Sequence, residues 1–142
     1  MLKNYTTKIS AMQSAGEIQS ILASHGAKKI MTDYEGGHII GINFIIDTPL
    51  GARAFMLPAR VDGVAAALAK QGTKCDYAHA ENVAWRILKD WVAAQMAFLE
   101  SEQAALDEIF LPYMVNREGK TMYELLVDGN LVLPEGKHHD LK

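Results

Sequence analysis

The chain has 142 residues and a mass of 15.6 kDa, the usual size of one domain with a single core. Hydrophobic residues make up 49% and charged residues 22%, which excludes a disordered chain and predicts a fold that forms without a partner. The net charge of −3 excludes a strong overall positive field for nucleic acid or an anionic membrane. We expect a single domain over residues 1–142, with 130–142 as a loosely structured tail.

The charge is unevenly distributed along the chain. Residues 1–89 hold 10 Lys and Arg against 7 Asp and Glu, whereas residues 90–142 hold 4 against 10. Any anion-binding surface is therefore expected within residues 1–89. The single cysteine, Cys75, excludes an intrachain disulfide, and the sequence shows neither a signal-peptide pattern nor an apolar stretch of 18 residues. We expect a cytoplasmic protein without a membrane segment.

The first elements predicted are a strand and a helix. Residues Asn4–Ile9 alternate and are rich in β-favouring types, which predicts a strand. The next helix ends near His25, and its start has two candidates. Ser14 with Glu17 has the spacing of a capping box, and Ser10 offers a rival start one turn earlier.

A hairpin is predicted next. The runs Lys28–Tyr34 and His38–Ile46 flank Gly36 and Gly37, and glycines accept the positive φ that tight hairpins need. The second run is apolar on both faces, one of which carries Ile40, Ile42, Phe44 and Ile46. We therefore expect this sheet to be covered on both sides, by a helix and by the long helix or a second subunit, and we expect a homo-oligomer.

The remaining pattern completes an α+β fold. Arg53–Leu57 predicts a third hairpin strand, and Asp62 is expected to cap a short Ala-rich helix to about Lys70, which gives the order β-α-β-β-β-α. Residues Tyr77–Ala105 contain no Gly or Pro and predict one long amphipathic helix. Its expected core side carries Ala84, Ile87, Leu88, Trp91, Gln95, Phe98 and Leu99, and its other side an Arg86–Asp90 pair. An apolar turn around Pro112 is expected to fold back onto the core, and Thr121–Val127 predicts a last short helix.

Two groups of residues are candidates for contact with nucleic acid or another partner. On the long helix, Trp85, Arg86 and Lys89 combine an aromatic ring with cations, which suits base stacking and phosphate binding, whereas Trp91 is expected in the core. The competing interpretation is that both tryptophans are structural anchors. On or beside the sheet, Lys28, Lys29, Arg53 and Arg60 suggest a modest basic patch, or solvated lysines that discourage edge pairing.

Metal and catalytic chemistry have weaker signals. Cys75, Asp76, His79 and Glu81 offer ligand atoms close together, but the sequence has no second Cys/His pair at zinc-site spacing. We therefore expect no metal, no cofactor and no catalytic residue. An enzyme would require the fold to bring His38, Cys75 or His79 together with carboxylates in one cleft.

Several sequence strings carry a family resemblance. These are Lys3-Asn-Tyr-Thr-Thr7, Pro58-Ala59, Ala84-Trp-Arg-Ile-Leu-Lys-Asp-Trp91, Ala94-Gln95 and Phe110-Leu-Pro-Tyr-Met114. Over about residues 3–136 their order and spacing resemble a family of small proteins encoded by bacteriophages and integrated mobile elements, mostly of Gram-positive and gut anaerobic bacteria. The resemblance implies a genomic setting and assigns no functional residue.

Binding without catalysis is the leading hypothesis for function. The first form is an accessory protein of a phage or mobile element that binds nucleic acid or a nucleic-acid-processing complex. The alternative is an inhibitor that binds a host protein or defence complex through an acidic or apolar surface, since acidic surfaces imitate nucleic acid. A metal-dependent enzyme is a distant third hypothesis.

Overall fold

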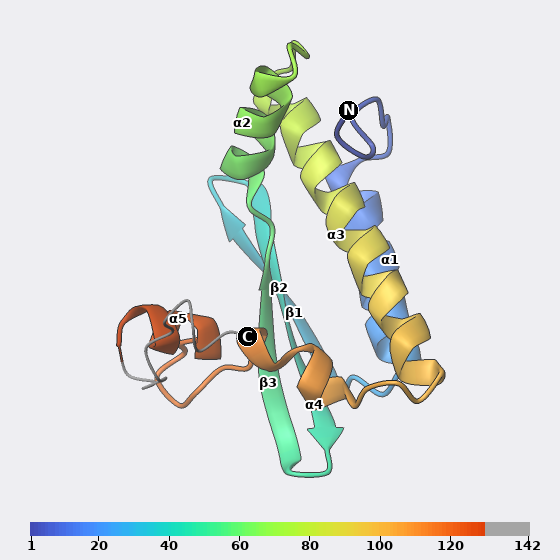
Figure 1. The fold of residues 1–142 in the computed structure, drawn as a ribbon, viewed down its shortest axis with the longest axis vertical. Helices are drawn as coiled ribbons and strands as arrows, with labels where there is room; N and C mark the ends of the chain where they lie inside the picture. The colour runs from blue at the N-terminus through green and yellow to red at the C-terminus, as the bar shows by residue number, and fades with distance from the viewer. Residues whose placement is uncertain (130–142) are drawn as a thin grey trace, which may run out of the picture.

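The computed structural model describes residues 1–129, so the expected tail at 130–142 lies outside the described residues. The elements are α1 (Ala11–Ser24), β1 (Lys29–Glu35), β2 (His38–Thr48), β3 (Gly51–Pro58), α2 (Val61–Lys70), α3 (Tyr77–Glu100), α4 (Leu106–Ile109), the 3-10 helix η1 (Leu111–Tyr113) and α5 (Met122–Val127). Figure 1 shows the sheet beside the long helix α3, with α5 at the opposite side. The predicted α+β class, with an antiparallel sheet, a long helix and a short later helix, is confirmed.

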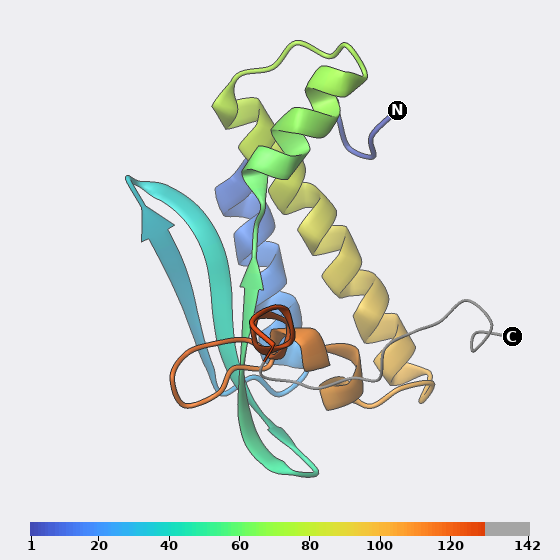
Figure 2. The same ribbon diagram turned by 60° about the vertical axis from the view of Figure 1, so that its left-hand side comes forward.

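The sheet is antiparallel with the strand order β1-β2-β3. Gly36 and Gly37 form the two-residue loop of the first hairpin with φ of 57° and 80°, as the two glycines predict. Phe44 of β2 lies opposite Phe55 of β3, and their rings stack with centroids 5.1 Å apart. Helices α1 and α3 lie on one face of the sheet (Figure 2), so these aromatic side chains are buried between the sheet and the two helices.

Because of a β-bulge in β2, the buried face of this strand differs from the predicted one. The pairing passes from Asp33 opposite Gly41 to Tyr34 opposite Ile39, which leaves Ile40 as an extra residue. One extra residue reverses the alternation of side chains beyond it. Ile39, at 2% exposure, is therefore buried on the same side as Ile42, and the prediction for Ile40 is wrong.

The N-terminal segment is a turn, so the predicted strand Asn4–Ile9 is wrong. Asn4 has a φ of 65°, and its Nδ2 atom donates a 2.8 Å hydrogen bond to Asp90 Oδ2 on α3. A side chain that bonds a distant helix overrides the β propensity of its neighbours. Helix α1 then begins after Ser10, whose Oγ accepts from the Gln13 backbone N–H at 3.0 Å; Ser10 is the start that is confirmed.

Two helix ends also differ from their predicted positions. Arg60 is the residue before α2 and makes no side-chain capping bond, while Asp62 lies inside the first turn and is not the cap. Helix α3 begins after Asp76, whose Oδ1 accepts from the His79 backbone N–H at 2.9 Å. It ends at Glu100 and not at Ala105.

The core has a main cluster and a smaller one. The main cluster joins α1, β2, β3, α3 and Phe110, whose ring meets those of Phe44 and Trp91 edge-on at 5.7 and 5.6 Å. The segment around Pro112 thus folds back onto the core as predicted. The smaller cluster lies between α2 and the start of α3 and contains Val61, Leu68, Ala80, Val83 and Ala84. The outer face of the β1–β2 half of the sheet has no helix against it within residues 1–129, so no helix of the described chain provides the second cover that was expected there. Cover by a second subunit stays a prediction.

Candidate functional site

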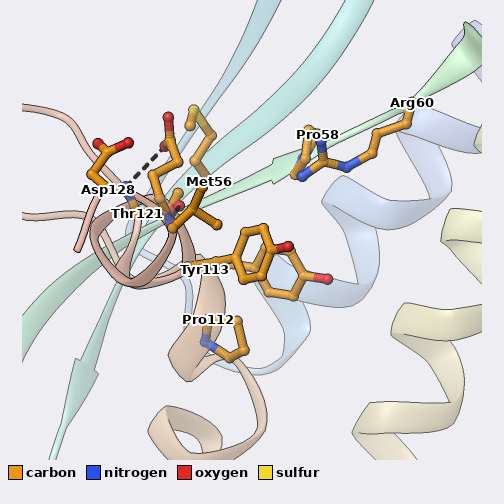
Figure 3. Close-up of a pocket in the computed structure, with 10 residues that line it drawn as sticks. Met56, Pro58, Arg60, Pro112, Tyr113, Thr121 and Asp128 are labelled. Atoms are coloured by element: carbon orange, nitrogen blue, oxygen red, sulfur yellow. Dashed lines mark hydrogen bonds between the residues drawn. The ribbon is translucent and has the colours of Figure 1, made fainter. Parts of the chain in front are cut away.

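Two pockets with shared lining residues form a hollow on the surface beside β3. One has a volume of 710 Å³ and lies between β3, η1 and α5 (Figure 3). The other has a volume of 290 Å³ and lies between β3, the start of α2 and α3. Pro58, Arg60 and Tyr113 line both pockets, so the two join. We call them together the β3 groove.

The end of the β3 groove beside α3 is apolar. Its walls are side chains of α2 and α3, namely Val64, Ala84, Ile87, Leu88 and Trp91. The Trp91 ring meets the Tyr113 ring edge-on at 5.8 Å and 73°, and meets the Phe110 ring edge-on at 5.6 Å. This end therefore offers a shaped surface for an apolar group.

The other end of the β3 groove is polar and rests on α5. Thr121 Oγ1 accepts from the Glu124 backbone N–H at 3.1 Å, and Glu124 Oε1 accepts from the Thr121 backbone N–H at 3.0 Å. Hydrogen bonding to the Glu124 carboxyl, first from the Thr121 backbone N–H and then from the Thr121 side chain, lowers the pKa of Glu124. Asp128 pairs with Lys120 at 2.8 Å, and this hydrogen bond raises the pKa of Lys120. Both acidic residues of this wall thus have partners within the chain.

Arg60 is the positive charge at the junction of the two ends. It lines both pockets, and Figure 3 shows its side chain extending alongside Pro58. Within residues 1–129 it is the one Lys or Arg that lines either pocket, and no described carboxylate forms an ion pair with it. An exposed guanidinium of this kind can accept a carboxylate from outside the chain through two parallel N–H donors.

The predicted contact residues of α3 are structural. Trp85 has 0% exposure, and its Nε1–H donates to the Ile39 carbonyl at 3.1 Å, so Trp85 is removed from the contact surface. Arg86 donates to Glu17 Oε2 of α1 at 2.9 Å, and Lys89 lies 3.9 Å from Glu17 Oε1. The hydrogen bond from Arg86 lowers the pKa of Glu17. These cations join α1 to α3.

The predicted Arg86–Asp90 pair is wrong. Asp90 accepts from Asn4 and lies 3.4 Å from Lys3 Nζ, and the bond from Asn4 lowers the pKa of Asp90. The Lys3-Asn4 and Lys89-Asp90 strings therefore meet in space.

The predicted basic patch on the sheet does not assemble. Lys28 pairs with Asp47 at 2.7 Å, and Lys29 lies opposite Ile45 near the β2–β3 hairpin. Arg53 lies opposite Ile46 at the same end of the sheet. Arg60 lies beyond the other end of β3, about 20 Å away at the rise of a strand. Arg60 alone of the predicted residues thus lines the β3 groove.

The candidate metal and catalytic residues are dispersed as well. His79 Nε2 is 2.6 Å from the Tyr5 carbonyl, which orients His79 as a structural residue, and Cys75 is exposed. His38 lies 3.1 Å from Glu81, but neither lines the neighbouring pocket beside Tyr77. In the described part of the chain, no three His, Cys, Asp or Glu residues are placed to hold a metal ion.

Tyr113, Tyr123 and the α5 wall are groove residues that sequence patterns did not identify as a site. The Phe110-Leu-Pro-Tyr-Met114 and Pro58-Ala59 strings contained the signal, since Pro58, Pro112 and Tyr113 line the groove. Their separation in sequence hid their common location.

No family model, curated protein or solved structure matches the chain. Over residues 1–129 no helix has the length and apolar character that crossing a bilayer requires.

Proposed function

We propose that the protein is a non-catalytic accessory protein that binds a segment of another protein in the β3 groove. The observation that carries this proposal is Arg60, an exposed cation without a described ion-pair partner at the junction of an apolar and a polar pocket. The family resemblance supports a bacteriophage or mobile-element setting. In that setting the partner belongs to a nucleic-acid-processing complex or to a host defence complex.

The groove favours one kind of segment. Pockets of 710 and 290 Å³ match the size range of small-ligand sites and admit individual side chains of a peptide. The end formed by Leu88 and Trp91 suits a large apolar side chain, and aromatic residues such as Tyr113 and Tyr123 are common in protein interfaces. Arg60 suits a carboxylate. The segment therefore carries a large apolar residue close to an Asp or Glu.

Nucleic acid has less support as the partner. Lys28, Arg86 and Lys89 lie within 4 Å of carboxylates of the chain, and Arg53 and Arg60 lie at opposite ends of β3. Within residues 1–129 the β3 groove has Arg60 as its one lining cation. Nucleic-acid affinity depends on several cations that neutralise phosphates together.

Selection of displayed random short peptides on the immobilised protein tests the proposal. We expect enrichment of sequences that pair a large apolar residue with Asp or Glu. Fluorescence anisotropy with an enriched peptide should then give an affinity that falls about tenfold or more in Arg60→Glu, because one charged hydrogen-bond pair is lost and repulsion is added.

The matched control is Lys74→Glu, the same charge change at an exposed residue that lines neither pocket of the groove. It should bind like the parent protein. Enriched peptides that bind Arg60→Glu unchanged would contradict the proposal. Tight binding of single- or double-stranded oligonucleotides at low salt would favour nucleic acid instead.

A further inference from the structure

Strand β1 is an open edge of the sheet. The sheet order places β1 at one side, and within residues 1–129 no other strand pairs with its free edge. Figure 2 shows β1 as the outermost strand, away from β3. The β3 side differs, because Met114 forms a bridge with Phe55 and the Val115 backbone N–H donates to the Ala54 carbonyl. Only the β1 edge is thus open along its length in the described part of the chain.

Three residues of β1 share the outer face of the sheet. Lys29, Met31 and Asp33 lie opposite Ile45, Asn43 and Gly41, and the Asn43 amide donates to Asp33 Oδ2 at 2.6 Å across this face. Met31 is 67% exposed, which is high for a large apolar side chain in a strand. Asn43 lies directly opposite it, and the apolar Ile45 lies diagonally across on the same face. The open edge therefore has an exposed apolar centre between a cation and an anion.

We propose that a second copy of the chain pairs with this edge, antiparallel, about a two-fold axis at Met31. In this register Lys29 lies opposite Asp33 of the second copy, and Asp33 lies opposite Lys29 of the second copy. The two Met31 side chains meet at the axis. Residues directly opposite in an antiparallel pair are in contact on the same face, so both charge pairs and the apolar pair form together.

The order of charges selects this register. A two-residue shift in either direction places a charged side chain opposite Met31 and leaves Asp33 without a cation opposite it. Lysine on an edge strand discourages pairing when no acid faces it, but here the second copy supplies one. Closed two-fold symmetry is also the commonest arrangement of homo-oligomers.

Pairing at β1 leaves the β3 groove free. The groove lies beside β3, at the opposite edge of the sheet from β1. A dimer joined at β1 therefore has a six-stranded sheet with one open groove near each of its two outer edges. Two grooves on one particle raise the apparent affinity for a partner with two copies of the bound segment. The dimer does not depend on what the groove binds.

Sedimentation velocity on charge variants tests the proposal. The parent protein should show a concentration-dependent monomer–dimer equilibrium, with a dimer of twice the 15.6 kDa chain mass. Lys29→Glu replaces both attractive pairs by repulsive ones, so its dimer should dissociate about tenfold or more readily, and Asp33→Lys should behave alike. An equimolar mixture of these two variants restores opposite charges at both contacts and should form a heterodimer.

Recovery in the mixture separates pairing from misfolding, since a misfolded variant would not regain a partner. Lys8→Glu, the same charge change at an exposed residue outside β1, should dimerise normally. A parent protein that stays monomeric at high concentration would overturn the proposal, as would a mixture that stays monomeric. The register has its own readout: in a Cys75→Ser background, Met31→Cys should form a disulfide-linked dimer on mild oxidation, and no such dimer would contradict an axis at Met31.

Discussion

The indole nitrogen of Trp85 donates a 3.1 Å hydrogen bond to the backbone carbonyl of Ile39. Ile39 precedes the bulge residue Ile40, so this bond joins the first half of α3 to the irregular part of β2. Trp85 is fully buried, and a buried carbonyl needs a donor. Trp85 therefore holds the helix and the bulged strand together and does not contact a partner.

Trp85→Phe should lower the free energy of unfolding by about 2 kcal/mol, because it leaves a small cavity and removes the indole N–H that donates to the Ile39 carbonyl. Urea denaturation followed by circular dichroism measures this. Trp91→Phe is the matched control. Trp91 is partly buried, and no described residue accepts a hydrogen bond from its indole. Trp91→Phe should therefore lower the free energy of unfolding by about half as much as Trp85→Phe, or less. Equal losses in the two variants would refute the role given to Trp85.

Gly41→Ala should destabilise the fold by about 1 kcal/mol or more. A Cβ atom at Gly41 would lie 3.1 Å from the Leu57 carbonyl oxygen, which belongs to the neighbouring strand and cannot move freely. Gly16→Ala is the opposite case. Gly16 lies within α1, and a Cβ atom there would meet no other part of the protein within 4 Å. The change should therefore raise the free energy of unfolding by about 0.5–1 kcal/mol. Thermal melts of both variants check the two signs, and stabilisation by Gly41→Ala would show that the strands are not so closely packed.

The His25 side chain should make stability depend on pH. Its Nδ1 lies 2.8 Å from the Ile21 carbonyl and its Nε2 lies 2.7 Å from Glu100 Oε1, so the charged ring donates at both positions. The bond to Ile21, and then that to Glu100, raise the pKa of His25 above its ordinary value of 6.5. The stabilisation is therefore complete below pH 6.5 and is lost as the pH rises through the raised pKa.

Urea midpoints on either side of this range test the pH effect. On going from about pH 6 to about pH 9, the parent protein should lose more stability than His25→Gln. Both proteins share every other titrating group, so the difference isolates His25. An equal loss in the two proteins would show that the His25 contact does not form in solution.

Thr121→Ala should loosen the wall of the β3 groove. The change removes the capping bond to the Glu124 backbone N–H, which is typically worth about 1 kcal/mol to a helix. We expect weaker binding of a selected peptide with little change in overall melting temperature. Thr6→Ala, at an exposed threonine far from α5 in the sequence, should leave peptide binding unchanged. Unchanged binding in Thr121→Ala would mean that α5 does not shape the site.

The sequence predicts the hairpins and the long helix because their signals are local. Gly36 and Gly37 specify a tight turn, and apolar residues at three- and four-residue steps in a run without Gly or Pro predict a helix. The buried side of α3 was predicted less well, because α3 packs against α1 and the sheet on one side and against α2 on another. A helix with two packed sides has apolar residues around most of its circumference, so periodicity cannot distinguish Trp85 from Trp91.

The candidate site was less accessible to sequence reasoning. Arg86 is partnered by Glu17, which is 69 residues away in sequence, so a local count of charges overestimates the free cations. The β3 groove combines residues of β3, α3, η1 and α5, and only the fold brings them together. Arg60 was predicted as a contact residue, but as part of a basic patch. It lies apart from the other cations of that patch, and this isolation is why we propose a single carboxylate, and not a phosphate backbone, as its partner.

Nuclear magnetic resonance mapping of a selected peptide tests the central claim most directly. Titration of the peptide into the isotopically labelled protein reports which backbone amides change environment. We predict the largest shifts at Arg60, in the second half of α3 near Leu88 and Trp91, and from Tyr113 to Asp128. Shifts confined to α1 or β1, with Arg60 and Tyr113 unaffected, would contradict binding in the β3 groove.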